Sequence, residues 1–291
     1  MEYKYFQKTY KLRKFIDTNN LHRVNLCINE KSVQYLYKNP HLINWDLLSI
    51  NCNAINLLKK NINKLYWNNL SKNINAVDIL QIVPDKIDWY SLSRNPKAIN
   101  LLKTNLNKVD WLSLSSNPNA IDLLKNNPNK INWYHLSENY NAIEILKANF
   151  NKIVWLSFCT NQNPEAIMML RENPEKINWN FLSNNTSYDA IKLLNENIDK
   201  INWITLSANP NAMEILKVYP EKINWSYLSR NVNAIDLLKY NTSKINWYYL
   251  SKNSNAIKIL KVNQDKINWY NFSKNPAIFY AKSKKMIYTI I

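Results

Sequence analysis

The sequence contains no glycine among its 291 residues, and this absence excludes several classes of site at once. Phosphate-binding loops and dinucleotide-binding turns use glycine where the backbone must approach the ligand closely, so neither motif is present. Histidine and cysteine are also scarce, with three of each, and no two cysteines form a Cys-x-x-Cys pair. The sequence therefore predicts no metal site, no cofactor and no catalytic triad. We expect a protein that is not an enzyme and has no small-molecule substrate.

Long apolar runs are missing as well. The longest are far shorter than the roughly 20 residues of a membrane span, and the first residues, MEYKYFQKTYKLRKF, do not read as a signal peptide. Because the cysteines also give no disulfide framework, we expect a soluble intracellular protein in a reducing compartment, without a membrane partner.

Acidic residues are outnumbered, with 21 Asp and Glu against 38 Lys and Arg, which gives a net charge of +17. Such an excess favours acidic partners. An AT-rich coding sequence explains it equally well, because Lys, Asn, Ile and Tyr are all abundant.

Tryptophan, by contrast, occurs only at fixed intervals. Its 11 copies stand 22 residues apart, or 24 on either side of Trp179, and no Trp occurs elsewhere. Self-similarity at such a period is typical of solenoids, in which each unit buries its apolar face only by stacking on its neighbours. The consensus is W-x-x-L-S-x-N-P-x-A-I-x-L-L-K-x-N-P-x-K-I-N, and positions are counted below from each Trp as position zero. The Trp residues are Trp45, Trp67, Trp89, Trp111, Trp133, Trp155, Trp179, Trp203, Trp225, Trp247 and Trp269.

The polar residues of the unit predict two helices. Asn-Pro at positions six and seven starts a helix that runs to about position fifteen, where the second proline group at position seventeen ends it. Asn or Asp at position twenty-one caps a shorter helix, W-x-x-L-S, which is partly 3₁₀ in character. Asn at the junctions is expected to take the left-handed angles that Gly usually supplies. A leucine-rich repeat is the structural alternative, but its strand needs alternating aliphatic residues that this unit lacks.

We therefore predict an all-α fold, an α-solenoid of 22–24-residue two-helix repeats with N- and C-terminal caps. It forms a single elongated domain over residues 1–291. Residues 1–22 form an N-terminal cap in which Leu12, Phe15 and Ile16 have helical spacing, and 23–44 form a degenerate repeat with Arg23 in place of Trp. Residues 45–268 form ten repeats. Residues 269–291 form a truncated repeat and a basic C-terminal cap, in which Pro276 starts a last helix.

Lysine stands at position nineteen of all ten complete units and forms a line of positive charge about 100 Å long if units pack at about 10 Å. Such a ladder would suit a polyanion. The structural alternative, which we favour, is that each Lys lays its stem over the adjacent Trp and meets a nearby acidic residue or helix carbonyl. Each Trp is in turn expected to pack between units. The ladder comprises Lys64, Lys86, Lys108, Lys130, Lys152, Lys176, Lys200, Lys222, Lys244 and Lys266.

The first functional hypothesis is a scaffold that binds a protein partner of unknown identity along an extended surface. The candidate contact residues are tyrosines at positions one and two and the variable residues at position fifteen. The second is binding of nucleic acid or another polyanion through the Lys ladder. The third is a structural component of a virion or replication compartment. The candidate tyrosines are Tyr90, Tyr134, Tyr227, Tyr248, Tyr249 and Tyr270.

Two segments carry a resemblance to known proteins, namely Lys130–Ser137, KINWYHLS, and Asn117–Leu124, NPNAIDLL. They resemble tandem-repeat proteins encoded by giant DNA viruses of protists, and the resemblance covers about residues 21–280. It implies a repeat fold, a viral origin and the host cytoplasm as location, but no activity. More weakly, the unit is similar to the leucine-rich repeat variant of bacteria, which alternates α and 3₁₀ helices.

Overall fold

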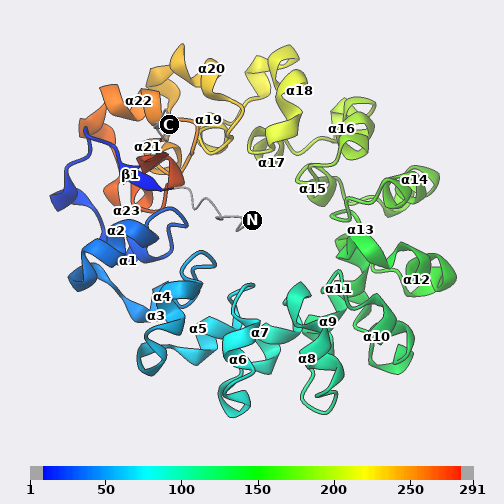
Figure 1. Ribbon diagram of the computed structural model, residues 1–291. Coiled ribbons are helices and arrows are strands. Elements are labelled where there is room, and N and C mark those ends of the chain that lie inside the picture. The colour runs from blue at the N-terminus through cyan, green and yellow to red at the C-terminus, as the bar shows by residue number, and fades with distance from the viewer. Residues whose placement is uncertain (1–8, 283–291) are drawn as a thin grey trace, which may run out of the picture.

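Residues 9–282 are described by a computed structural model, in which short helices follow one another around a closed ring (Figure 1). Within these residues there are 23 α-helices, 15 3₁₀ helices and one sheet of two short strands. The predicted all-α solenoid is confirmed, and no leucine-rich repeat sheet runs along it.

Each of the eleven Trp residues begins a short helix, and Arg23 begins the equivalent helix of the degenerate first unit, so the ring has twelve units. We call these the tryptophan helices. They are α1 (Arg23–Cys27), α3 (Trp45–Leu48), α5 (Trp67–Ser71), α7 (Trp89–Ser93), α9 (Trp111–Ser115), α11 (Trp133–Glu138), α13 (Trp155–Phe158), α15 (Trp179–Leu182), α17 (Trp203–Ser207), α19 (Trp225–Leu228), α21 (Trp247–Leu250) and α23 (Trp269–Phe272).

A second helix follows in every unit but the last. In Figure 1 the tryptophan helices lie nearer the centre of the ring than the second helices, most clearly from α9 to α18. The second helices are α2 (Val33–Lys38), α4 (Ile55–Lys59), α6 (Val77–Leu80), α8 (Ile99–Lys103), α10 (Ile121–Lys125), α12 (Ile143–Ala148), α14 (Pro164–Glu172), α16 (Tyr188–Asn195), α18 (Met213–Val218), α20 (Ile235–Lys239) and α22 (Ile257–Val262).

The predicted cap of the tryptophan helix is confirmed in most units. Asn132 accepts a hydrogen bond at Oδ1 from the backbone N–H of His135, at 3.0 Å. Leu136, at position three, is completely buried beneath this helix. The polar cap and the apolar anchor therefore start the helix together.

The proline at position seventeen was expected to end the second helix. That helix ends before the proline is reached, and the proline begins a separate 3₁₀ turn. These turns, a third element that the sequence analysis missed, end at position nineteen, which is Lys in every one of them but the first. They are Pro40–Leu42 in the first unit, then Ile62–Lys64, Pro84–Lys86, Pro128–Lys130, Phe150–Lys152, Pro174–Lys176, Ile198–Lys200, Pro220–Lys222, Thr242–Lys244 and Gln264–Lys266. Other 3₁₀ turns precede some second helices or lie near the termini, at Thr18–Asn20, Pro96–Ala98, Tyr140–Ala142, Pro210–Ala212 and Pro276–Ile278.

The expectation of left-handed asparagines at the junctions is wrong. No residue in the described part of the chain has a positive φ. At the end of α10, Asn127 has φ −135° and ψ 57°, and its Nδ2 donates to the carbonyl of Leu123 at 2.9 Å. Asparagine thus closes the helix by capping a carbonyl with its side chain, which needs no unusual backbone angle.

Asparagine at position six forms a ladder that links every unit to the one before it. Asn117, which has no exposed surface, donates from Nδ2 to the carbonyls of Ser93 at 2.9 Å and Asn95 at 3.0 Å. Its Oδ1 accepts from the backbone N–H of Asn119, at 3.0 Å, as a cap should. All three hydrogen-bonding groups of one buried amide are therefore used, two of them between units.

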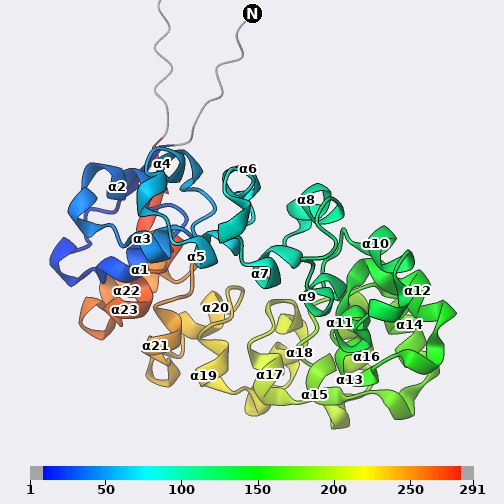
Figure 2. The same ribbon diagram turned by 90° about the horizontal axis from the view of Figure 1, so that it is seen from below.

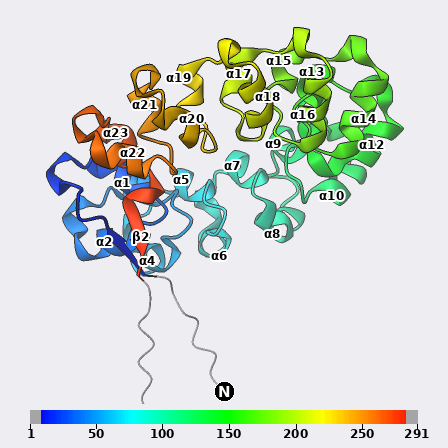
Figure 3. The same ribbon diagram turned by 90° about the horizontal axis from the view of Figure 1, so that it is seen from above.

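The same ladder closes the ring. Asn29 of the first unit donates to the carbonyls of Ser273 at 3.1 Å and Asn275 at 3.0 Å, positions four and six of the last unit. Strand β1 (Tyr10–Leu12) pairs antiparallel with β2 (Phe279–Ala281). The blue and red ends of the chain accordingly lie side by side in all three views (Figure 1, Figure 2 and Figure 3). The solenoid has no open end.

Closure corrects the predicted elongated domain and its two separate caps. The N-terminal segment is not helical; it forms β1 and a turn, and buries Ile16 while Phe15 packs on Phe272 with ring centroids 6.5 Å apart. The last unit has no second helix, because Pro276–Ile278 is a 3₁₀ turn that leads into β2. The two ends of the chain together complete the last unit. Most of the predicted basic tail, including Lys284 and Lys285, lies outside the described residues.

Candidate functional site

The tryptophans pack on the core but are only partly buried. We expected them to be enclosed between units, and they are enclosed only in part. One face of most rings is covered by the position-nineteen Lys of the same unit. Lys130 Nζ, for example, lies 4.8 Å from the centroid of Trp111, and Lys152 Nζ lies 4.9 Å from that of Trp133. The other lysines within 6 Å of a Trp ring are Lys64, Lys86, Lys108, Lys200, Lys244 and Lys266.

These contacts resemble the structural role predicted for the Lys ladder, with two differences. Each Lys covers the Trp that lies 19 or 21 residues before it, and not the next Trp along the chain. In addition, no lysine of the ladder forms an ion pair within residues 9–282. Most of the ion pairs form instead at the lysines of position fourteen, as between Asp236 and Lys239 at 2.9 Å. The charges of the ladder are therefore exposed and follow the ring.

The predicted tyrosines divide into two sets on the tryptophan helices. Tyr90, Tyr134, Tyr248 and Tyr270, at position one, are 42–52% exposed. Tyr227 and Tyr249, at position two, are half-buried and pack against each other, with ring centroids 6.2 Å apart.

The sequence analysis missed that position one is apolar in other units as well. Leu112, Leu156 and Ile204 stand there and are 41–49% exposed. Positions one and five lie on one side of each helix, so their side chains form one exposed surface, which we call the tryptophan-helix face. Counting positions along the repeat, without regard to residue type, would have found it.

The charge of the tryptophan-helix face varies around the ring. From α9 to α17 position five carries no cation; its residues are Ser116, Glu138, Thr160, Asn184 and Ala208. After α19, α21 and α23 it carries Arg230, Lys252 and Lys274.

Position fifteen forms a second exposed apolar set, on the second helices. Val218, Tyr240 and Val262 are 68–80% exposed in three consecutive units. Polar residues such as Glu172 and Glu196 interrupt this set, as Asn180 and Ser226 interrupt position one, and its longest run is one unit shorter than the run from Tyr90 to Leu156.

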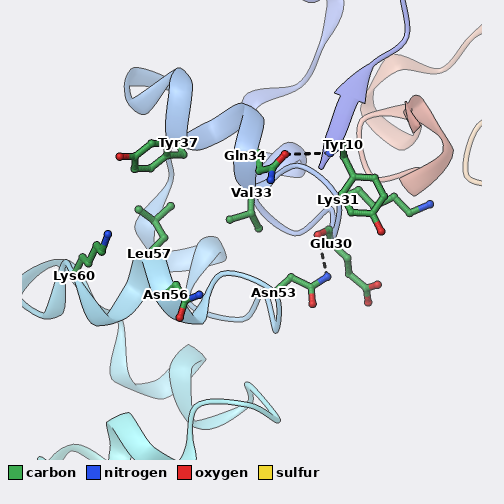
Figure 4. A pocket seen from close by; sticks show the side chains of 10 residues that line it. All are labelled: Tyr10, Glu30, Lys31, Val33, Gln34, Tyr37, Asn53, Asn56, Leu57 and Lys60. Atoms are coloured by element: carbon green, nitrogen blue, oxygen red, sulfur yellow. Dashed lines mark hydrogen bonds between the residues drawn. The ribbon is translucent and has the colours of Figure 1, made fainter. Parts of the chain in front are cut away.

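A hollow of about 450 Å³ lies between α2 and α4, near the closure of the ring (Figure 4). Tyr10 reaches it from β1, where its backbone N–H donates to Gln34 Oε1 at 3.0 Å. No histidine or cysteine lines it, so it offers no nucleophile–base pair. It is lined by Tyr10, Glu30, Lys31, Val33, Gln34, Tyr37, Asn53, Asn56, Leu57 and Lys60.

Residues 9–282 contain no cluster of His, Cys, Asp and Glu able to hold a metal ion. Within the same residues no helix has the length and apolar character to cross a membrane.

Two of the three cysteines have a structural role. Ser137, at position four, donates from Oγ to the carbonyl of Trp133 at 2.7 Å and accepts from the N–H of Val154 at 3.0 Å. Cys159 replaces this serine in its unit, and its Sγ accepts from the N–H of Asn178 at 3.3 Å. Burial raises the pKa of the Cys159 thiol, and that of Cys27 likewise. Both thiols therefore stay protonated and unreactive at neutral pH.

No family model, curated protein or solved structure matches the chain. These comparisons transfer no role to the chain, and the resemblance to giant-virus repeat proteins stays a prediction.

Proposed function

We propose that this protein is a non-enzymatic scaffold that binds a protein partner along its tryptophan-helix face. The observation that carries the proposal is the row of exposed apolar side chains at position one, which includes Tyr90, Leu112, Tyr134, Leu156 and Ile204. Exposed apolar surface of this extent is typical of interaction sites. Tyrosine in particular is enriched where proteins meet.

The composition of the row favours protein over nucleic acid. Leucine and isoleucine offer no flat ring on which a base can stack. Cations that would neutralise phosphates are absent from position five between α9 and α17. The ring also holds the row in one arrangement before binding, which lowers the entropic cost of ordering the site.

The proposal is tested by replacing Leu112, Tyr134 and Leu156 by Ser. These side chains are exposed, so the free energy of unfolding should change by only about 0.5 kcal/mol per substitution. Binding should weaken about 30-fold or more, because one or two such contacts contribute about 2 kcal/mol each at an interface. The measurement is the Kd, by fluorescence anisotropy, of peptides selected from a random phage-displayed library on the wild-type protein.

The control replaces Val218, Tyr240 and Val262, which are even more exposed but lie on the second helices, by Ser. It should bind the selected peptides as the wild type does. Equal losses in both variants, or a library that yields no peptide, would show that the tryptophan-helix face is not a protein-binding site.

Binding of a polyanion is the second candidate function, because the lysines of the ladder are exposed and free of ion pairs in the described part of the chain. In that case, replacing Lys130, Lys152, Lys176 and Lys200 by Gln should reduce the log–log salt slope of duplex binding by several units. Each phosphate contact contributes about −0.9 to that slope. We expect instead a slope that is unchanged and a lower melting temperature, because three of the four lysines cover a Trp ring. A flattened slope in a variant that melts normally would favour the polyanion.

A structural component of a virion or replication compartment is the third candidate. It is supported only by the resemblance to giant-virus proteins, which also implies a viral origin and the host cytoplasm.

A further inference from the structure

Three consecutive units near the closure of the ring carry a free cation at position five of the tryptophan-helix face; two of them also carry tyrosine at position one, and the first has Ser226 there with Tyr227 at position two. These units begin with α19, α21 and α23, and they carry Arg230, Lys252 and Lys274 at position five. None of these cations takes part in an ion pair within the described residues. Lys274 Nζ lies 4.6 Å from the centroid of the Tyr270 ring, one helical turn earlier. We call this set the basic sector; it comprises Tyr227, Arg230, Tyr248, Tyr249, Lys252, Tyr270 and Lys274.

No acidic residue faces the basic sector from its own helices. Residues 225–231, 247–253 and 269–275 contain neither Asp nor Glu. The acidic residues of these units lie elsewhere: Asp236 is on α20, paired with Lys239, and Asp265 is in a 3₁₀ turn. The sector is therefore positive without internal compensation.

Resting on the proposed function, we infer that the basic sector binds an acidic stretch of the partner polypeptide. Charge complementarity requires the bound segment to be negatively charged, because carboxylates pair with Arg and Lys at hydrogen-bonding distance. The place of the sector on the ring sets the class of this segment, since the sector lies on the same helix face as the apolar row and is separated from Ile204 only by Ser226 at position one, which suits a polypeptide. The tyrosines supply apolar contact beside the charges, and Tyr248 and Tyr249 already pack edge to face at 5.4 Å.

The geometry also sets the size of the stretch. Three units at about 10 Å each extend over about 20–30 Å, which an extended chain covers with about six to nine residues. Binding partners should therefore combine such an acidic stretch with apolar residues that reach the row at Ile204 and beyond.

The experiment selects phage-displayed random peptides of about twelve residues on the full-length protein. The same selection is made on a variant with Arg230→Gln, Lys252→Gln and Lys274→Gln. A matched control carries Lys222→Gln, Lys244→Gln and Lys266→Gln, with the same change in charge but on the Lys ladder, two of them in units of the basic sector.

Peptides selected on the wild type and on the control should be strongly acidic, and the acidic excess should disappear on the sector variant. The best synthetic peptide should bind the sector variant at least tenfold more weakly. The same peptide with Gln for its acidic residues should lose a similar factor on the wild type.

Selected peptides without acidic excess, or equal losses in the sector and control variants, would overturn the inference. The proposed function would survive either result if replacing Leu112, Tyr134 and Leu156 still abolished binding. A library that yields no peptide on any form would overturn both. An oligothymidylate that binds more tightly than the best peptide, and loses affinity only in the sector variant, would make the sector a nucleic-acid site.

Discussion

Replacement of Asn117 by Asp is expected to lower the free energy of unfolding by about 3–6 kcal/mol, the largest effect we predict for a single side chain. The substitution removes the two N–H donors that reach Ser93 and Asn95 in the preceding unit. It leaves the buried carbonyl of Ser93 unpaired, at a cost of about 1–3 kcal/mol, and removes one of the two hydrogen bonds of the Asn95 carbonyl, which still accepts from the N–H of Ala98 at 3.0 Å. It also directs a buried carboxylate at those carbonyls, which is unfavourable unless the carboxylate is protonated. Chemical denaturation followed by circular dichroism measures the change.

The matched control is Asn129→Asp in the same unit. Asn129 is exposed in a 3₁₀ turn, at position eighteen. Other units naturally carry an acidic residue there, such as Asp85 and Glu221. This variant should unfold within about 0.5 kcal/mol of the wild type. If Asn117→Asp behaved like the control, the asparagine ladder would not hold neighbouring units together.

Much of the unit could be predicted from sequence because local signals agree with one another. Asn132 before Trp133 predicted a helix start, and Leu136 predicted its buried side; both predictions are confirmed. Asn139 at position six was expected to cap the second helix, but its Oδ1 caps the 3₁₀ turn Tyr140–Ala142, and α12 begins only after that turn, at Ile143. The inter-unit bonds of Asn139 could not be foreseen, because they depend on how far apart successive units lie.

The Lys–Trp contacts show a similar limit. Lys130 was expected to lie over a neighbouring Trp, but its nearest Trp along the chain is Trp133. The structure places it over Trp111, because the 3₁₀ turn that begins at Pro128 directs the chain back over its own unit. That turn was interpreted only as the end of a helix.

The closure of the ring was the largest feature that the sequence could not reveal. Whether a solenoid is open or closed depends on a small rotation per unit, added over all units. No single residue encodes that sum. The degenerate ends, with Arg23 in place of Trp and Pro276 without a following helix, were interpreted as caps because open solenoids need them.

The tryptophan-helix face illustrates a third limit, which concerns exposure. Tyr90 and Leu112 occupy the same position, but only the tyrosine was singled out, because the residue type was weighed before the position. Their similar exposures, 50% and 42%, show that the position determines the surface. The basic sector was missed for the same reason, since Arg230, Lys252 and Lys274 share a position that the consensus leaves open.

Closure changes how such a protein should unfold. An open solenoid loses its terminal units first, because each has only one neighbour. Here the first unit is bonded to the last through Asn29, so each unit has two neighbours. Unfolding must therefore first break an interface between two units. The interface between the first and last units is the only one that the chain does not cross, so we expect it to open first.

A disulfide across that interface is therefore expected to stabilise the ring by up to about 5 kcal/mol. The pair Tyr10→Cys and Ala281→Cys is suitable because these residues are partners in the β1–β2 register. The flanking backbone bonds, Lys282 N–H to Thr9 and Arg13 N–H to Ile278, make this a non-hydrogen-bonded pair. The Cα atoms of such a pair are about 4.5 Å apart, close enough for a disulfide. The bond would close a loop of nearly the whole chain and so restrict the unfolded state strongly.

The comparison is made between the oxidised and reduced forms of the same variant, with Cys52 replaced by Ser to leave only the buried native thiols Cys27 and Cys159. Oxidation should proceed within one chain, leave the elution volume unchanged and raise the free energy of unfolding. The increase in the free energy of unfolding should be smaller than the value expected from restricting the unfolded chain alone, because strain in the new disulfide lowers it. Failure to form the bond within a chain, or its formation only between chains, would mean that the ends do not meet. In that event the asparagine ladder would have two free ends, and unfolding would begin there, at Asn29 and at Asn275.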